Sequence, residues 1–140
     1  MTPRESLDAV AHHDLCFGCG IANLFGLQME VERDGDHVAG RFFVKQDHGG
    51  RSAVAHPGVL AAALEEAISL VAAPPGDRAY TRRLELDFDA GAALGTYVQV
   101  EASVERREGD DVWVTAVARA VDGTALARAR GLIASAAADA

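Results

Sequence analysis

The chain lacks an excess of positive charge, because its 13 basic residues are outnumbered by 21 acidic ones and the net charge is −8. An acidic protein has no electrostatic reason to bind nucleic acid or an anionic membrane surface. The sequence also lacks an apolar run of about 18 residues, the length that suggests a membrane span, and its first residues lack a signal-peptide apolar core. These absences predict a cytoplasmic protein with no nucleic-acid or membrane partner.

Cysteine is scarce, and the two cysteines, Cys16 and Cys19, have the spacing of a metal or redox pair. A zinc site needs four ligands, so His12 and His13, or Asp14 with one of them, would have to fold back onto the pair. Two adjacent histidines cannot easily both reach one tetrahedral ion. A thioredoxin-type motif is expected beside a βαβ pattern, which the sequence does not show. The sequence therefore favours a structural loop without metal over a metal or redox site.

An alanine-rich apolar helix is the clearest feature that the sequence contains. Its apolar residues recur with the spacing of one helical face: Val59, Leu60, Ala63, Leu64, Ala67, Ile68 and Val71. Pro57 suits the first helical position, and Pro74-Pro75-Gly76 ends the helix. Free N–H groups at such a helix start can polarise a carbonyl oxygen. Glu65 lies two turns further in, where low-dielectric surroundings cost a carboxylate free energy, and Glu66 points about 100° away from it as an expected paired or partly exposed carboxylate.

Segments that alternate apolar and polar residues lie on both sides of this helix in the sequence. Strands are predicted at 27–32, 37–45, 83–89, 98–105, 112–121 and 124–134, with turns at Asp34-Gly35, Glu108-Gly109 and Asp122-Gly123. One apolar face per strand suits an antiparallel sheet that is covered on one side. The pattern predicts an α+β fold, in which one antiparallel sheet of five to six strands wraps around a long central helix. We expect a single domain over 1–140, with flexible tails at 1–12 and 136–140.

Several segments match one enzyme family in the right order. His56 is followed by a glycine, hydrophobic residues and, nine positions after it, Glu65. The preceding loop, 48–56, is glycine-rich, with Ala53 where the family has a glycine. Further matches lie at 16–27, 81–88 and 122–127, so the likeness runs from about residue 16 to residue 135. In these features the chain resembles the hotdog-fold acyl-CoA thioesterases, in particular the phenylacetate-pathway and 4-hydroxybenzoyl-CoA types.

The resemblance implies an enzyme that hydrolyses an acyl-CoA or acyl-carrier thioester to a free acid and a thiol. Glu65 is then the nucleophile or general base, while a backbone N–H at the helix start polarises the carbonyl. The family's usual donor glycine is Pro57 here, and proline has no N–H, so the donor is expected to be Gly58. The predicted catalytic residues are Glu65, His56, Gly58 and Thr81. The predicted substrate-binding residues are His48, Asn23, Pro57 and Arg82. No cofactor is expected beyond the coenzyme A of the substrate.

The helix is apolar on nearly all sides, and one curled sheet cannot cover it completely, so a partner subunit is predicted. Hotdog proteins generally pair two protomers into one continuous sheet with two active sites at the interface. The resemblance thus implies a homodimer or a dimer of dimers, in which Glu65 of one subunit meets residues of the other.

Alternatives remain open at this point. Glu65 could pair with an arginine across the dimer instead of acting in catalysis. A module that binds an acyl or aromatic ligand without turnover is compatible with Pro57. An acyl-thioester dehydratase or hydratase usually has an acidic residue six positions after its Pro-Gly proline, where this chain has Ala63. The acyl group is not determined by the sequence.

Overall fold

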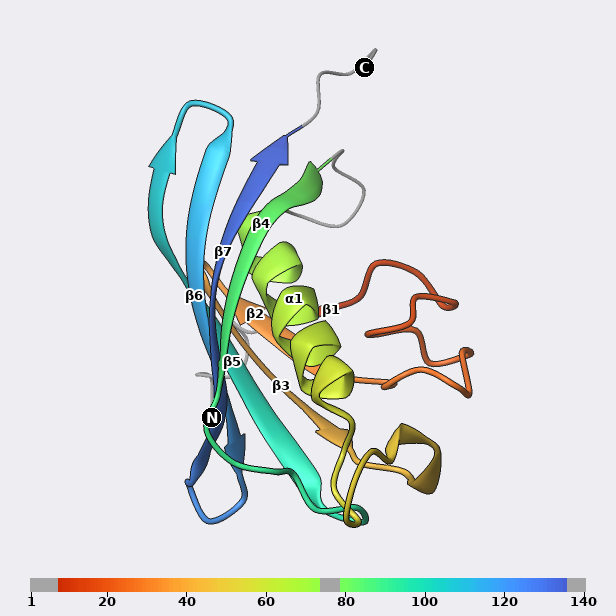
Figure 1. The fold of residues 1–140 in the computed structure, drawn as a ribbon. Helices are drawn as coiled ribbons and strands as arrows, with labels where there is room; N and C mark the ends of the chain where they lie inside the picture. The colour runs from red at the N-terminus through yellow and green to blue at the C-terminus, as the bar shows by residue number, and fades with distance from the viewer. Residues whose placement is uncertain (1–7, 74–78, 136–140) are drawn as a thin grey trace, which may run out of the picture.

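The structure, a computed structural model, describes residues 8–73 and 79–135 (Figure 1). Within these residues, seven strands form one antiparallel sheet in the order β1-β2-β3-β5-β6-β7-β4. Along the chain the elements are β1 (Asp8–Val10), β2 (Glu30–Asp34), β3 (His37–Phe43), the 3-10 helix η2 (Gln46–His48), α1 (Pro57–Ala72), β4 (Ala79–Phe88), β5 (Tyr97–Glu108), β6 (Asp111–Ala120) and β7 (Ala125–Ser135). One long helix held by one antiparallel sheet confirms the predicted architecture.

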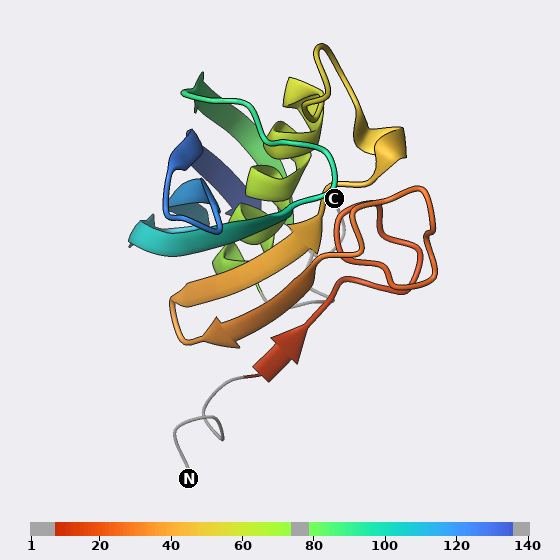
Figure 2. The ribbon, with the colours of Figure 1, turned by 90° about the horizontal axis from the view of Figure 1, so that it is seen from below.

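The sheet curves around α1, so that the helix lies along its concave face (Figures 1 and 2). The helix packs against β5, β6 and β7 and buries Leu64, Ile68 and Val71 completely. Removing each such side chain from water stabilises the fold by about 1.5–3 kcal/mol. Gly131 of β7 makes room for this contact, since a Cβ there would lie 2.9 Å from Ile68 Cγ2. The core therefore sits between the helix and the concave face of the sheet.

Both ends of α1 are capped by side chains. The Nδ1 of His56 accepts a hydrogen bond of 2.8 Å from the Gly58 N–H, and Pro57 takes the first helical position, as predicted. At the other end, Arg33 and Arg107 donate to the carbonyls of Val71 and Ala72 at 3.4 and 3.2 Å. The predicted stop at 74–76 lies outside the described residues. In the part of the chain that is described, no helix is long and apolar enough to span a membrane.

The sheet has more strands than the five to six predicted. The additional strand, β1, has three residues and pairs with β2. It lies inside the segment 1–12 that was predicted as a tail; the remainder of the predicted tails, 1–7 and 136–140, lies outside the described residues. A strand this short has no readable period, and its pairing with β2 holds it in place. The strand predicted from residue 27 begins only at Glu30, because the N–H groups of Leu27 and Met29 bond to the loop carbonyls of Phe17 and Gly18 at 2.8 and 2.9 Å.

One edge of the sheet is formed by β4, which pairs with β7 along one side only. Its ten residues alternate between half-buried and exposed. The register shifts between Thr81 and Arg83, so that Arg82 is an extra residue. Bulges of this kind bend a strand and redirect neighbouring side chains. The edge strand therefore brings Thr81 to the helix, while no strand among the described residues pairs with its outer side.

Candidate functional site

Glu65 lies in the middle of α1 and faces the edge strand β4. Its Oε1 accepts a hydrogen bond of 2.8 Å from the hydroxyl of Thr81. Burial raises the pKa of the Glu65 carboxyl, and the hydrogen bond from Thr81 only partly opposes this effect. The structure thus brings together two of the predicted catalytic residues. A half-buried carboxyl with a raised pKa is suited to accept a proton near neutral pH.

Glu65 and Thr81 line a hollow of about 240 Å³ between α1, β4 and the N-terminal loop. The lining residues are His12, Glu65, Ser69, Ala73, Ala79, Tyr80, Thr81 and Ile133. The hollow is small, and its walls are partly polar. It can hold a water molecule and the reacting end of a ligand beside the Glu65 carboxylate.

The predicted carbonyl donor, the N–H of Gly58, lies at the start of α1 and away from Glu65. The Gly58 N–H points to the ring of its own neighbour His56, and both residues are exposed. Neither residue lines the hollow that contains Glu65. Seven residues separate Gly58 from Glu65, which corresponds to about 10 Å along a helix axis. Within this chain, the N–H and the carboxylate therefore do not converge on one carbonyl group.

His48, a predicted substrate-binding residue, is buried, with 4% of its surface exposed. Its Nδ1 accepts a hydrogen bond of 3.1 Å from the Lys45 N–H, which leaves Nε2 to donate to the Gly26 carbonyl at 3.3 Å. Burial lowers the pKa of His48, and the nearby charge of Lys45 lowers it further. In this position a neutral histidine joins two loops.

Asn23 organises the loop that contains the cysteines. Its side-chain amide donates to the Leu15 carbonyl at 3.1 Å, and its oxygen accepts from the N–H groups of Phe25 and Gly26, both at 3.2 Å. Such local side-chain bonds to the backbone are typical of Asn in turns.

Pro57 and Arg82 are both exposed. Pro57 stands at the open start of α1, beside Gly58. The Arg82 guanidinium forms a long ion pair of 3.8 Å with Asp111 on the neighbouring part of the sheet. Neither residue lines the hollow at Glu65.

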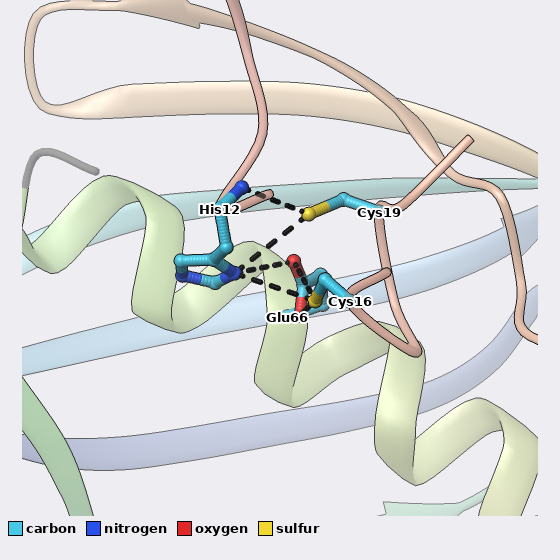
Figure 3. A group of neighbouring side chains, drawn as sticks. All are labelled: His12, Cys16, Cys19 and Glu66. Carbon is cyan, nitrogen blue, oxygen red and sulfur yellow. Dashed lines mark hydrogen bonds and ion pairs between the residues drawn. The ribbon is translucent and has the colours of Figure 1, made fainter. Parts of the chain in front are cut away.

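A second polar group surrounds Glu66, the next residue of α1 (Figure 3). The ligand atoms of His12, Cys16, Cys19 and Glu66 all lie within 4.8 Å of one another. We call these four residues the cysteine cluster. His12 Nδ1 lies 2.8 Å from Glu66 Oε2, 3.6 Å from the Cys16 sulfur and 3.7 Å from the Cys19 sulfur. The set has the donor types that hold a zinc ion.

The cysteine cluster changes the pKa values of its members. The contacts with Cys19 and Glu66 raise the pKa of His12 to about 11. Burial alone would raise the pKa of Glu66, but its hydrogen bonds with His12 and Cys19 outweigh burial and lower it. Burial raises the pKa of the Cys19 thiol. Glu66, only 4% exposed, is therefore a charged residue that depends on its partners.

The sequence pointed to the cysteines with His12 and, separately, to Glu66, but it did not predict that these residues lie together. The pair Cys16 and Cys19 and the neighbour His12 were candidates, and Glu66 was expected to be a paired or partly exposed carboxylate. The missing link is that the loop folds onto α1, 50 residues away in the sequence from Cys16 to Glu66. The available signal was the position of Glu66 on a helical face different from that of Glu65.

A larger hollow of about 1230 Å³ lies over β2, β3 and β5, and none of the predicted site residues lines it. Phe43 and Tyr97 stack there edge to face with ring centres 5.2 Å apart, and the Arg41 guanidinium lies over the Tyr97 ring at 4.9 Å. Its polar lining includes the exposed ion pair of Arg41 and Glu30, whose atoms lie 3.5 Å apart. The pair of Glu65 with Thr81 and the cluster around Glu66 both involve α1, which does not line this larger hollow.

One long helix that lies along the concave face of a curved antiparallel sheet defines a hotdog-fold protein. A half-buried carboxyl group, Glu65, lies in the middle of that helix. Residues 52–127 match the model of the thioesterase superfamily, and the chain belongs to this family. None of the curated proteins matches the chain.

Solved structures are similar to the chain in fold. The PaaI protein from the phenylacetic acid degradation operon of E. coli is 15% identical, with a TM-score of 0.75 over 79% of this chain and 81% of that one. A hypothetical thioesterase protein from Streptococcus pneumoniae TIGR4, solved with coenzyme A, is 16% identical, with a TM-score of 0.71 over 77% of this chain and 85% of that one. A further thioesterase superfamily protein is 19% identical, with a TM-score of 0.68; the match covers 76% of this chain but only 53% of that one.

Proposed function

We propose that the protein hydrolyses an acyl-CoA or acyl-carrier thioester to a free acid and a thiol. The observation that carries this proposal is the half-buried Glu65 carboxyl, bonded to Thr81 and facing a hollow. Membership of the thioesterase superfamily supports it, as does the coenzyme A bound to the similar protein from Streptococcus pneumoniae.

Glu65 acts on the thioester in one of two ways. As a general base it takes a proton from water while the water oxygen attacks the carbonyl carbon; the carbon–sulfur bond then breaks, and the proton passes to the leaving thiolate. As a nucleophile it attacks the carbonyl carbon directly, the carbon–sulfur bond breaks to release the thiolate, and water then hydrolyses the mixed anhydride to free the acid and Glu65. In both routes the Thr81 hydroxyl holds the carboxylate in place. The raised pKa of Glu65 supports the first route.

The carbonyl oxygen needs a hydrogen-bond donor while it gains negative charge. Gly58 is the first N–H of α1, because Pro57 has none. In the structure this N–H is bonded to His56 Nδ1, so the substrate carbonyl has to displace the imidazole. Rotation of the exposed His56 side chain is sufficient for this exchange. In this proposal, His56 accepts the hydrogen bond of the Gly58 N–H when no thioester is bound.

A second protomer brings the donor and the carboxylate together in this proposal. The two groups are separated along α1, and the outer side of β4 is unpaired within the described residues. Two β4 strands pairing edge to edge would form a continuous sheet and lay the two helices side by side in opposite directions. Gly58 of one copy then approaches Glu65 of the other. Analytical ultracentrifugation tests this step; a protein that is a monomer at all concentrations while active contradicts it.

A second candidate function has an observation in its favour. The proline at position 57 and the occupied Gly58 N–H weaken the carbonyl donor. A chain without a working donor would bind an acyl or aromatic thioester and not turn it over.

Thiol release from a panel of short, long and aromatic acyl-CoAs distinguishes the two functions. We expect release with at least one class, and its loss in Glu65→Gln. Glu108→Gln is the matched control, because Glu108 is an exposed carboxylate on β5 whose ion-pair partner is Arg106. Binding of a non-hydrolysable acyl-CoA analogue without turnover of any thioester would support the binding module and overturn the hydrolase.

A further inference from the structure

We propose that His12, Cys16, Cys19 and Glu66 bind one zinc ion, which clasps the N-terminal loop to the central helix (Figure 3). The site is separate from the proposed hydrolase function and does not depend on it. It also departs from the metal-free loop that the sequence favoured, because the fourth ligand comes from α1 and not from the neighbouring residues.

The spacing of the donor atoms fits a tetrahedral ion. Zinc binds sulfur at about 2.3 Å and nitrogen or oxygen at about 2.0–2.2 Å, which places tetrahedral ligand atoms about 3.3–3.8 Å apart. The Cys16 sulfur lies 3.5 Å from Glu66 Oε2 and 3.6 Å from His12 Nδ1. The Cys19 sulfur lies 3.7 Å from the same nitrogen. His12 and Glu66, at 2.8 Å, must separate slightly when an ion replaces the proton between them, and any pair near the 4.8 Å limit of the set must close in.

Backbone hydrogen bonds hold both cysteines in place. The Gly20 N–H donates to the Cys16 carbonyl at 2.8 Å, and the His12 N–H donates to the Cys19 sulfur at 3.1 Å. The second bond stabilises negative charge on sulfur, the form in which cysteine binds metal. At Gly18 an added Cβ would lie 2.4 Å from Glu66 Oε1, so only glycine lets the loop approach the carboxylate this closely.

The loop between β1 and β2 also needs a contact that holds it in place. Residues 11–29 are all described and contain no regular helix or strand. Uninterrupted loops of this length are uncommon unless they are functional or held by other means. Of its large apolar side chains, Leu27 and Met29 next to β2 are buried in the core, but five others are exposed: Leu15, Phe17, Ile21, Leu24 and Phe25. Metal binding supplies the folding free energy that packing does not provide here.

The donor set selects zinc and a structural role. Two thiolates with an imidazole favour zinc over magnesium or calcium, which prefer oxygen ligands. Four protein ligands leave no open position for a reacting water, as in structural zinc sites. The other ring nitrogen of His12 lies 3.5 Å from the Ser69 hydroxyl, which fixes the orientation of the ring. Because His12 also lines the hollow at Glu65, the clasp fixes one wall of that hollow.

Metal analysis of the purified full chain tests the proposal. The protein is made without a histidine tag in zinc-supplemented medium, and its metals are measured by plasma mass spectrometry. We expect about one zinc per chain, and less than a tenth of that in the double variant Cys16→Ser, Cys19→Ser. His13→Ala and Glu65→Gln are matched controls that keep the zinc, since each is the sequence neighbour of a ligand and lies outside the cluster. Loss of zinc in either control to the level of the double variant contradicts the assignment of ligands.

A second measurement does not depend on the variants folding. Cobalt(II) replaces zinc in the wild-type chain, and a tetrahedral site with two thiolates gives strong visible bands and a sulfur-to-cobalt charge-transfer band. We expect saturation at one cobalt per chain and displacement by zinc. Protein that contains no zinc and gives no such bands overturns the proposal. So does a Cys16–Cys19 disulfide in protein purified without oxygen, because it would remove both thiolates.

Discussion

Glu65 and Glu66 are neighbours on one helix and have opposite environments. Glu65 faces β4 and a hollow, where the neutral Thr81 donates a hydrogen bond to it, and its pKa is raised. Glu66 faces the N-terminal loop, where His12 lies 2.8 Å away, and its pKa is lowered. One step along the helix rotates the side chain by about 100°. The difference shows that partners, and not burial alone, decide whether a half-buried or buried carboxyl is available to take a proton.

Replacing each carboxylate by its isosteric amide tests most directly whether Glu65 and Glu66 have different roles. In Glu65→Gln we expect turnover to fall by about 10²–10⁴-fold, the usual contribution of a general base, with unfolding free energy nearly unchanged. In Glu66→Gln we expect stability to fall by about 1–3 kcal/mol, because His12 loses its charged partner. Thiol-release kinetics and urea unfolding measure the two effects. Equal losses of stability in both variants would show that the two faces do not have different roles.

Gly18→Ala tests how tightly the cysteine loop sits on Glu66. An alanine Cβ would lie 2.4 Å from Glu66 Oε1, so the loop or the carboxylate must move. Overpacking of this kind costs about 1–3 kcal/mol, and we expect a lower urea midpoint. Ala22→Ser is the control, because Ala22 is exposed in the same loop. A Gly18→Ala protein as stable as the control would mean that the loop does not depend on this contact.

Thr81 gives a smaller effect on the catalytic face. Thr81→Val keeps the β-branched shape and removes the hydroxyl that donates to Glu65. A hydrogen bond contributes about 0.5–1.5 kcal/mol, so we expect kcat to fall by about 2- to 10-fold on the best acyl-CoA of the panel. Thr81→Ser should recover most of the activity. If serine is as slow as valine, the methyl group and not the hydroxyl is what matters.

His48 offers the smallest effect and a contrast to His12. His12 lies beside a carboxylate and has a raised pKa, while the contacts of His48 are to backbone atoms and its pKa is lowered from 6.5. The unfolded chain then binds the proton more readily, so this contribution to stability is present above about pH 6.5 and is lost as the pH falls below it. Lys45 reinforces the shift and Asp47 opposes it.

Urea unfolding between pH 7.5 and pH 5 measures this contribution. We expect stability to fall less steeply with falling pH in His48→Gln than in the wild type. His37→Gln is the control, because His37 is a half-buried histidine paired with Ser103 and Glu101. Parallel slopes for His48→Gln and the wild type would show that His48 is equally easy to protonate in both states.

Much of the fold could be predicted because its pattern is local. The helix was placed at its observed start by Pro57 and by the spacing of its apolar residues, and it ends within one residue of its predicted end. Turns at Gly35, Gly109 and Gly123 take the positive φ angles of 60°, 57° and 92°, which glycine adopts easily. The strand β1 was missed because three residues carry no period.

The candidate site was predictable only in part. The family resemblance placed Glu65 and Thr81 in one predicted site, and in the structure the two residues are hydrogen-bonded. The burial of His48 could not be foreseen, because it depends on how the loop 48–56 folds back on itself. The contact of His12 with Glu66 joins residues 54 positions apart.

The sequence by itself determined one apolar helix, an alternating sheet and a carboxylate placed inside that helix. These follow from hydrophobic periodicity and helix-end signals, which act over a few residues. Only the tertiary structure decided that Glu65 pairs with the neutral Thr81, while the adjacent Glu66 lies against a histidine and two cysteines. That choice depends on which distant segment packs against each face of α1, and no spacing along the chain encodes it.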